Sequence, residues 1–452
     1  MFGVILNFVK DDLISFIEKL KKGIYKLYIL MNKNTKTRYT IFQILIEVFK
    51  KNRNFETVFN QKITEFNYNQ NDISFIHNVC LNSMRRSTHC QIILNKFIKK
   101  KLKINEFILL SSAIVQIVYL NIKPYAVVNE TVNVSKKIKV FPGFVNAILK
   151  NILHNIDDIK KIEIKIEDFP KWFVDEIQKT NGISLISFIK TFYKQPSLHL
   201  VFKSAKYLKD FKEPHIKSSE KSAFIKIQKK IKEIDNFKKG EWWVQDFSSM
   251  IPLVINSDIN NFNILDMCAA PGGKAFQVLS NNNVILNEIN KNRIIKLKEN
   301  LSRLKFSPEI KNFNGMDFNE NIKYDIVLVD SPCSSIGTIR RHPEILFKSN
   351  KPNFKILNKL QKDLLKKSSK LVKNKGKIIY MVCSFFHSET INIINNFLDE
   401  HKNFSIEKYR PNKGFLDIKD LISDEGYFLT IPTKYKSHYI DGFFSVQLIK
   451  ND

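Results

Sequence analysis

Hydrophobic and polar positions alternate with two different periods along the chain. Between residues 37 and 152, apolar residues recur three or four positions apart, as in YTIFQILIEVFKK and NEFILLSSAIVQIVYLNI. This spacing places apolar side chains on one face of a helix. Pro124 is expected to end one helix, and PGFVNAILKNIL is expected to start another. The pattern predicts an all-α domain over residues 37–154.

After Gly240 the pattern changes to short apolar runs separated by helical stretches. NILDM, NVILNE, YDIVLVD and KIIYMVC are predicted strands, with amphipathic helices such as NRIIKLKENLSRL between them. This alternation predicts a Rossmann-like α/β domain over residues 241–452, with a mostly parallel twisted sheet and helices on both faces. Ligands bind beyond the carboxyl ends of such strands, so the loops after the strands form the candidate site.

Two segments have weaker patterns. Residues 155–240 mix short apolar runs with polar stretches, which indicates a connector with a small α/β element. Residues 1–36 are treated as an N-terminal extension. Its apolar spacing admits an amphipathic surface helix, while Met31 offers an alternative start of translation. Acidic residues interrupt its apolar part too early for a signal peptide.

Composition limits the class of protein. The net charge of +29 suggests a polyanionic partner, nucleic acid before membrane, although Lys, Asn, Ile and Phe are abundant throughout the chain. An apolar content of 44% without a run of membrane-span length predicts a soluble, cytoplasmic protein with no membrane partner, and we expect a monomer. The five cysteines form no Cys-x-x-Cys pair, so we expect reduced thiols and no metal site.

The loop after the first strand, LDMCAAPGGKAFQVL, suggests a cofactor turn. Gly272 and Gly273 let a ligand approach the backbone, and a following helix is expected to offer free N–H groups. A phosphate-binding P-loop is excluded, because Cys268 and Ala275 stand where that motif needs Gly and Ser or Thr. Glu288 ends the second strand, about 20 residues after the turn, where a carboxylate accepts hydrogen bonds from ribose hydroxyls. The two features favour a nucleoside-containing cofactor.

Two later loops carry thiols. VLVDSPCSSIGTIRRHPEI places Asp330 at a strand end, with Cys333 shortly after it. The following Arg340, Arg341 and His342 either bind RNA phosphates or order the loop. In GKIIYMVCSFFHSE, a buried strand ends at Cys383, the second thiol. The alternative interpretation of Cys383 is an ordinary core cysteine. If the two strands are neighbours, both thiols lie over one crevice.

A thiol beside a nucleoside cofactor suits methylation of a pyrimidine. A thiolate that adds to carbon 6 activates carbon 5 for methylation, and a base then removes the carbon 5 proton and expels the thiolate. Nearby cations lower the pKa of such a thiol. Asp330 is a candidate to assist by protonating or hydrogen-bonding N3 of the base. The pyrimidine must be unstacked, so we expect a single-stranded or looped substrate.

The motifs CAAPGGK, DSPCSSIGTIRRHPEI and VCS resemble the Sun/Nop family of RNA cytosine-C5 methyltransferases, closest to members that act on bacterial 16S ribosomal RNA. IKPYAVVNETVNVSKK and GFVNAILKNI look like a NusB-type RNA-binding domain. The resemblance implies a class I methyltransferase domain, with Cys383 as nucleophile and Cys333 assisting product release. It also implies S-adenosyl-L-methionine as cofactor, bound by Cys268, Ala269, Ala270, Pro271, Gly272, Gly273, Lys274, Glu288, Asp317 and Asp330.

Departures from the family pattern leave alternatives open. Val382 stands where the family usually has Thr, and Glu288 where Asp is more frequent. The alternatives are a tRNA cytosine-C5 methyltransferase and an RNA-binding ribosome assembly factor that has lost its activity. DNA methylation is disfavoured, because that chemistry uses the cysteine of its Pro-Cys pair as nucleophile. Separate replacement of the two cysteines distinguishes these cases.

Overall fold

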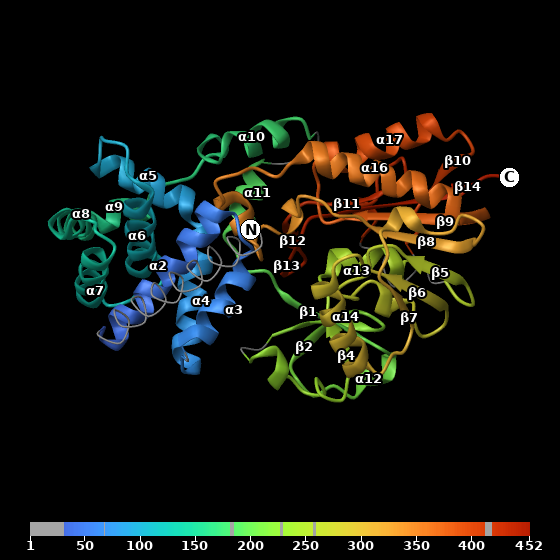
Figure 1. Cartoon of the computed structure of the whole chain (residues 1–452), viewed down its shortest axis with the longest axis horizontal. Helices are drawn as coiled ribbons and strands as arrows, with labels where there is room; N and C mark the ends of the chain where they lie inside the picture. The colour runs from blue at the N-terminus through green and yellow to red at the C-terminus, as the bar shows by residue number, and fades with distance from the viewer. Residues whose placement is uncertain (1–30, 67, 181–184, 227–228, 256–258, 412–417) are drawn as a thin grey trace, which may run out of the picture. The chain divides into compact units, whose positions relative to one another are not determined.

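The computed structural model describes residues 31–66, 68–180, 185–226, 229–255, 259–411 and 418–452. The expectations for residues 1–30 therefore lie outside the described part. The chain divides into two compact units, the first extending to Ile164 and including Phe347–Asn350, and the second comprising the remainder. Figure 1 labels their elements along the chain. None of the helices described here is long and apolar enough to cross a bilayer.

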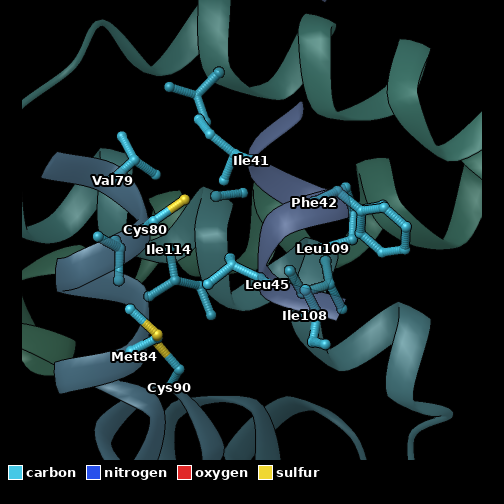
Figure 2. Close-up of a cluster of buried hydrophobic side chains, with 14 of the residues drawn as sticks. Ile41, Phe42, Leu45, Val79, Cys80, Met84, Cys90, Ile108, Leu109 and Ile114 are labelled. Carbon is cyan, nitrogen blue, oxygen red and sulfur yellow. The ribbon is translucent and has the colours of Figure 1, made fainter. Parts of the chain in front are cut away.

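The first unit is helical, as predicted. Its apolar faces share one core, and Figure 2 shows Ile41, Leu45, Cys80 and Ile114 gathered there. Pro124 occupies the first turn of α7, and the preceding helical segment already stops at Tyr119. Proline fits this position because no intrahelical hydrogen bond is lost. The elements are α2 (Lys33–Lys51), α3 (Phe55–Phe66), α4 (Gln70–Arg85), α5 (Ser87–Phe97), α6 (Ile104–Ile114), the π-helical η1 (Val115–Tyr119), α7 (Pro124–Lys137), α8 (Pro142–His154) and α9 (Ile156–Lys160).

The second unit begins with short helices and a small antiparallel sheet. The strand order is β2-β3-β1-β4, and Trp242 is buried against the sheet together with Leu200 and Phe202. Residues 165–244 thus contain both helical and strand structure. The elements are η2 (Ile166–Asp168), α10 (Lys171–Gln178), α11 (Leu185–Phe192), β1 (Leu198–Phe202), α12 (Ala205–Lys209), β2 (His215–Ser219), β3 (Ser222–Ile225), η3 (Ile231–Glu233) and β4 (Trp242–Val244).

A larger sheet forms the rest of this unit and has the order β10-β14-β9-β8-β5-β6-β7. Five neighbouring strands, β9, β8, β5, β6 and β7, run parallel to one another. Strand β14 pairs antiparallel with β9, β10 and β11. The mostly parallel sheet is therefore confirmed. Its strands are β5 (Asn263–Asp266), β6 (Asn283–Asn287), β7 (Glu309–Lys311), β8 (Tyr324–Asp330), β9 (Val372–Val382), β10 (Phe404–Glu407), β11 (Phe428–Thr430) and β14 (Phe443–Lys450).

Helices cover both faces of this sheet, as the strand patterns predict (Figure 1). Because successive strand side chains point to opposite faces, Val327 and Val329 pack with α16 (Phe354–Leu371) and α17 (Ile391–Glu400). Ile326 and Leu328 instead pack with α13 (Phe247–Val254) and α14 (Lys291–Leu304). The remaining short elements are η5 (Gly315–Asp317), η6 (Ile336–Thr338), α15 (Glu344–Phe347), η7 (His387–Glu389), β12 (Thr433–Tyr435) and β13 (His438–Ile440).

The helix expected after the glycine turn is absent. Between β5 and β6 the chain forms only the 3-10 turn η4 (Ala275–Gln277). Ser280 and three consecutive asparagines follow within a few residues. Such residues compete for backbone hydrogen bonds and favour turns over helix interiors. The segment is therefore too short for an α-helix, and the prediction of one was wrong.

Candidate active site

Two cysteines meet at the carboxyl ends of neighbouring strands. β8 and β9 pair in parallel, with Asp330 opposite Met381, so the loops after them leave the sheet side by side. Cys333 follows β8 and Cys383 follows β9, and their sulfur atoms lie 3.4 Å apart. Ser335 Oγ is also 3.4 Å from Cys383 Sγ. The expectation that both thiols lie close together at neighbouring strand ends is confirmed, but only Cys383 lines the cavity described below.

The two thiols differ in acidity. The pKa of Cys383 is lowered below its ordinary value, and the hydrogen bond with Cys333 is the largest cause. Burial and Asp330 oppose this shift, while Ser335 and Lys274 add to it. The same hydrogen bond, together with burial, holds the pKa of Cys333 well above its ordinary value. Either thiol can donate in this contact, and the opposite pKa shifts make Cys383 the better thiolate of the pair. Only the thiolate is nucleophilic.

A partly buried ion pair lies beside the thiols. Lys274 Nζ is 2.8 Å from Asp330 Oδ2 and 5.1 Å from the ring centre of Phe443. Burial disfavours the ammonium group, but the Asp330 carboxylate outweighs burial and raises the pKa of Lys274. The lysine thus stays cationic, and its charge favours the Cys383 thiolate. Lys274 couples the glycine turn to the thiol pair.

The glycine turn brings the backbone close to its neighbours. Gly272 has φ +109°, and a Cβ at this residue would lie 2.0 Å from Cζ of Phe276, so a side chain is excluded there. The Arg293 guanidinium donates a hydrogen bond to the carbonyl of Ala270 and anchors the turn. Burial raises the pKa of the neighbouring Cys268 thiol, with further contributions from nearby carboxylates. Cys268 is therefore not a second nucleophile.

Glu288 fits the hydroxyl-binding position expected at the end of β6. Its carboxylate is 2% exposed, and Oε1 accepts a hydrogen bond from the backbone N–H of Asn290 at 2.9 Å. Oε2 lies 3.1 Å from Arg293 Nη1 but has no hydrogen bond among the described residues. A buried carboxylate oxygen in need of a donor matches a ribose hydroxyl. Asp317 is exposed in η5, beyond the end of β7.

A cavity of about 560 Å³ unites much of the predicted site. Predicted site residues that line it are Ala269, Ala270, Pro271, Gly273, Lys274, Asp330, Arg341, His342 and Cys383. Cys333 contacts this wall through Cys383. Cys268, Gly272, Glu288, Asp317, Cys333 and Arg340 are not among the lining residues. The cavity thus joins the glycine turn to the Cys383 thiol, whereas Glu288 and Asp317 lie outside it.

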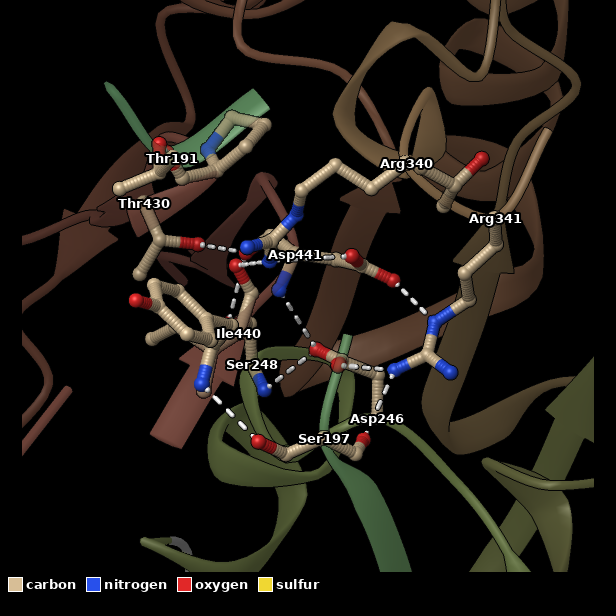
Figure 3. Close-up of polar contacts among 12 residues, drawn as sticks. Thr191, Ser197, Asp246, Ser248, Arg340, Arg341, Thr430, Ile440 and Asp441 are labelled. Carbon is tan, nitrogen blue, oxygen red and sulfur yellow. Dashed lines mark hydrogen bonds and ion pairs between the residues drawn. The ribbon is translucent and has the colours of Figure 1, made fainter. Parts of the chain in front are cut away.

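The arginines after Cys333 mainly tie the loop to other segments (Figure 3). Arg340 is fully buried and donates to the Ile440 carbonyl, with Asp441 Oδ1 3.3 Å from its guanidinium. Arg341 lies 2.6 Å from Asp441 and 2.9 Å from Asp246. Burial leaves the Arg340 side chain no access to RNA in this structure, so it orders the loop. RNA contact stays a prediction for Arg341 and His342.

His342 adds a second cationic group to the cavity wall. Its Nδ1 is 3.5 Å from Glu344 Oε1. Burial opposes the charged imidazolium, but the Glu344 carboxylate outweighs burial and raises the pKa of His342. This shift extends the charged form toward neutral pH. The wall near Cys383 therefore carries cationic groups that are each paired with a carboxylate.

Sequence reasoning gave no role to three acids, of which Asp441 and Glu389 are buried and Asp246 is partly buried. Asp246 and Asp441 hold Arg341, and Glu389 accepts hydrogen bonds from serines beside both thiols. Asp246 and Asp441 stand in VQDFSSM and DGFFSVQ, stretches that are otherwise largely apolar or uncharged. A lone acidic residue in such a stretch could have indicated a carboxylate with a structural partner. Its partners, however, lie far away in the sequence.

Comparisons with known proteins agree on both units. Residues 253–449 match the family described as 16S rRNA methyltransferase RsmB/F, and residues 35–154 match the NusB family. Ribosomal RNA small subunit methyltransferase B of Photorhabdus laumondii is 28% identical over 365 residues, 75% of this chain and 84% of the relative. The Proteus mirabilis protein of that name is 26% identical over 396 residues, 81% of this chain and 92% of the relative.

Solved structures share the fold. PH0851 aligns with a TM-score of 0.68 at 17% identity, covering 93% of this chain and 100% of that chain. The crystal structure of NSun6 from Pyrococcus horikoshii with SFG aligns with a TM-score of 0.52 at 15% identity, covering 64% of this chain and 100% of that chain. At these identities the likeness concerns the arrangement of the elements.

Proposed function

We propose a specific reaction for this chain, which carries a methyltransferase domain of the RsmB/F family and a NusB-family helical domain. It transfers a methyl group from S-adenosyl-L-methionine to carbon 5 of a cytosine in 16S ribosomal RNA, through a covalent bond between Cys383 and the base. The family domain supports an S-adenosylmethionine-dependent RNA methyltransferase. The cytosine-C5 chemistry rests on one observation, the thiol pair 3.4 Å apart at the cofactor-side cavity.

The proposed cofactor site combines residues of the glycine turn with acidic residues that follow the strands. In the turn from Cys268 to Lys274, Gly273 lines the cavity and has no atom closer than 3.8 Å to an added Cβ, so the backbone is open to a ligand there. Glu288 has a buried Oε2 without a hydrogen bond among the described residues, which suits a ribose hydroxyl. Asp317, exposed at the end of η5, is a further candidate contact of the cofactor. When bound, S-adenosyl-L-methionine supplies an electrophilic methyl group. The chain's own residues must therefore make carbon 5 of cytosine nucleophilic.

Cys383 begins the reaction as a thiolate. Its sulfur adds to carbon 6 of cytosine, and the electron pair of the carbon 5–carbon 6 double bond moves toward carbon 5 and the N3 side of the ring. The Cys333 thiol and the Lys274 ammonium favour the thiolate before addition. Asp330, 2.8 Å from Lys274, is the candidate to hydrogen-bond or protonate N3. Carbon 5 then accepts the methyl group.

Cys333 completes the reaction. A base must remove the carbon 5 proton, after which the carbon 5–carbon 6 double bond reforms and Cys383 leaves as a thiolate. The hydrogen bond to Cys383 is the largest cause of the raised pKa of Cys333. Once Cys383 is bonded to carbon 6, its sulfur carries no negative charge, so the Cys333 thiol becomes easier to deprotonate. The pair therefore suits sequential use of its two sulfurs.

The substrate assignment follows from the relatives and from charge. Both relatives are named ribosomal RNA small subunit methyltransferase B. The net charge of +29 and the cationic Arg341 and His342 on the cavity wall suit an RNA backbone. Cytosine must be unstacked to reach Cys383, so a looped or single-stranded target is favoured. The NusB-family unit is the candidate for additional RNA contacts.

The test combines unmodified 16S rRNA and S-adenosyl-L-methionine with the wild type, Cys333→Ala and Cys383→Ala. We expect wild-type transfer to carbon 5 of cytosine, measured by mass spectrometry of digested RNA. Cys383→Ala should show no transfer and no covalent RNA adduct. Cys333→Ala should accumulate an adduct that survives denaturing electrophoresis, because release is blocked after methylation.

Other outcomes separate the alternatives. An adduct that requires Cys333 in place of Cys383 would contradict the assigned roles. Transfer to tRNA but not to 16S rRNA would show that the substrate is tRNA. Cofactor binding without transfer to any RNA or ribosomal particle would indicate an inactive assembly factor.

Val382 stands where the family usually has Thr, and its side chain is fully buried in the core that includes α16 and α17. Apolar packing therefore takes the place of the threonine hydroxyl at this position.

A further inference from the structure

One buried carboxylate connects the loops of the two thiols. Glu389, in η7, is fully buried, and its Oε1 accepts a hydrogen bond from the backbone N–H of Ser334 at 2.7 Å. Its Oε2 accepts from Ser334 Oγ at 2.5 Å and from Ser384 Oγ at 2.7 Å. Ser334 follows Cys333, and Ser384 follows Cys383. A single side chain thus binds the residue after each thiol.

The helix above the sheet completes this attachment. Gln361 of α16 donates from Nε2 to Glu389 Oε1 at 3.3 Å and to the carbonyl of Pro332 at 3.0 Å. Cys333 therefore lies between two anchored residues, with Pro332 held by Gln361 and Ser334 by Glu389. On the other strand, the Tyr380 hydroxyl donates to the backbone carbonyl of Glu389 at 3.0 Å. Both loops and the helix depend on one acid.

We propose that Glu389 is a positioning residue that sets the separation and relative orientation of the Cys333 and Cys383 sulfur atoms. The proposal rests on the thiol chemistry proposed above. A buried carboxylate is costly unless its oxygens receive hydrogen bonds, and here four donors supply them. Since the donors flank the thiols, satisfying the carboxylate also fixes the sulfurs. Glu389 itself has no contact with the reacting atoms in this assignment.

The chemistry explains why such a fixed separation matters. The lowered pKa of Cys383 depends first on the hydrogen bond from Cys333, and hydrogen bonds weaken steeply with distance and misalignment. A shift of either loop therefore raises the pKa of Cys383 and removes the releasing thiol from carbon 5. Misplacement by about 1 Å at a reacting centre reduces rates by about 10²-fold. Loss of Glu389 should act through both effects.

The test compares Glu389→Ala, Glu389→Asp and Glu389→Gln with the wild type. We expect kcat for methyl transfer to fall by about 10²-fold in Glu389→Ala, with little change in KM for RNA. Asp is one methylene too short to reach both loops and should resemble Ala. Gln keeps the length, and the serine hydroxyls can accept from its amide, so Gln should restore much of the activity.

A second readout does not depend on catalysis. The pH midpoint for iodoacetamide alkylation of Cys383 should rise in Glu389→Ala and return toward wild type in Glu389→Gln. Ser384→Ala should shift the midpoint in the same direction. Ser445→Ala is the matched control, because Ser445 is an equally buried serine of the same sheet that bonds Tyr380 and Tyr409. It should leave the midpoint unchanged.

The two proposals fail in distinguishable ways. A wild-type midpoint in folded Glu389→Ala, judged by melting temperature and S-adenosylmethionine binding, would overturn the positioning role even if transfer were lost. If Glu389→Ala does not fold, the alkylation midpoint of Cys383 is compared in Ser384→Ala and Glu389→Asp. Unshifted midpoints in these two variants would overturn the positioning role. If the midpoint shifts in Glu389→Ala but the wild type forms no cytosine adduct, the positioning role of Glu389 is supported and the proposed reaction is contradicted.

Discussion

At the scale of single residues, neighbouring groups rather than residue type decide which thiol reacts. Cys383 and Cys333 are both partly buried cysteines that follow parallel strands. Their shared hydrogen bond nevertheless shifts the two pKa values in opposite directions. In Cys80 and Cys90 burial is the largest cause and raises the pKa of both thiols, although the Cys90 thiol also donates to the Ser111 carbonyl. Position next to a donor separates a nucleophile from a core cysteine.

The first residue-scale prediction concerns pH. A lowered pKa means that the Cys383 thiolate persists to lower pH than an ordinary thiolate and is lost as pH falls through that pKa. Cys333→Ala removes the main stabilising donor. The pH midpoint for alkylation of Cys383 should therefore rise, and alkylation near neutral pH should slow. Peptide mass mapping across a pH series measures this, with Cys383→Ala as the background.

A midpoint that falls or stays constant in Cys333→Ala would contradict the assigned donor. Cys268→Ser serves as the control. The raised pKa of Cys268 keeps that thiol protonated, so its replacement should leave the Cys383 midpoint nearly unchanged. Cys80 and Cys90 are buried in the helical unit and should label slowly in all variants.

At the scale of elements, close backbone approach holds the thiol loop against the last strands. The Gly337 N–H donates to the carbonyl of Cys383 at 3.0 Å, and the Gly442 N–H donates to the Gly337 carbonyl at 2.9 Å. A Cβ on Gly337 would lie 2.0 Å from the Gly442 carbonyl oxygen. Any side chain at this position therefore forces the loop away from β14. The loop after β8 is placed by contact, not by its own conformation alone.

The element-scale prediction follows from this contact. Gly337→Ala should displace η6 from Gly442, disturb the Cys383 backbone and reduce methyl transfer by about 10²-fold. S-adenosylmethionine binding should be largely retained, because the glycine turn lies on another loop. Gly143→Ala is the control, since the nearest atoms to its added Cβ belong to the exposed ring of Phe141, which can move. Steady-state kinetics and melting temperatures measure the comparison.

Equal transfer by Gly337→Ala and the wild type would show that the loop tolerates separation from β14. Loss of cofactor binding together with transfer would instead indicate general damage to the domain. A fall in transfer with intact cofactor binding is the expected result. It would assign the effect to the loop and the Cys383 backbone.

At the scale of the whole molecule, charge determines how RNA binding responds to salt. The net charge of +29 arises from 73 basic and 44 acidic residues. Cations that neutralise phosphates release counterions, and the slope of log K against log salt is about −0.7 per phosphate contact for single strands. Part of the excess lysine is expected to be ordinary solvated surface. Binding measurements over a salt series separate the two contributions.

The whole-molecule prediction is a steep salt dependence for 16S rRNA and a shallow one for S-adenosylmethionine. Affinity for an RNA fragment, measured by fluorescence anisotropy, should fall linearly on a log–log plot with a slope equivalent to several contacts. Cofactor affinity, measured by calorimetry on the same samples, should change far less. An RNA slope near zero would show that the positive charge takes no part in binding.

The sequence by itself determined the elements and the chemistry-bearing loops. Apolar periodicity is a local property, so it predicted the helical unit and the parallel strands from neighbouring residues. The glycine turn, Asp330 and both thiols also lie at strand ends, where local motifs identify them. The helix expected after the glycine turn was wrong because the following asparagines end the segment early. Local patterns therefore identified most residues of the candidate site.

Tertiary structure decided which polar residues belong to that site. Arg340 meets Asp441 across 101 positions, Arg341 meets Asp246 across 95, and Ser334 meets Glu389 across 55. No periodicity links residues so far apart, because their contacts depend on strand order and loop packing. The same packing buried Arg340, which the sequence offered equally as an RNA ligand or a loop anchor. A buried charge must find its partners inside the fold, and only the folded chain brings those partners together.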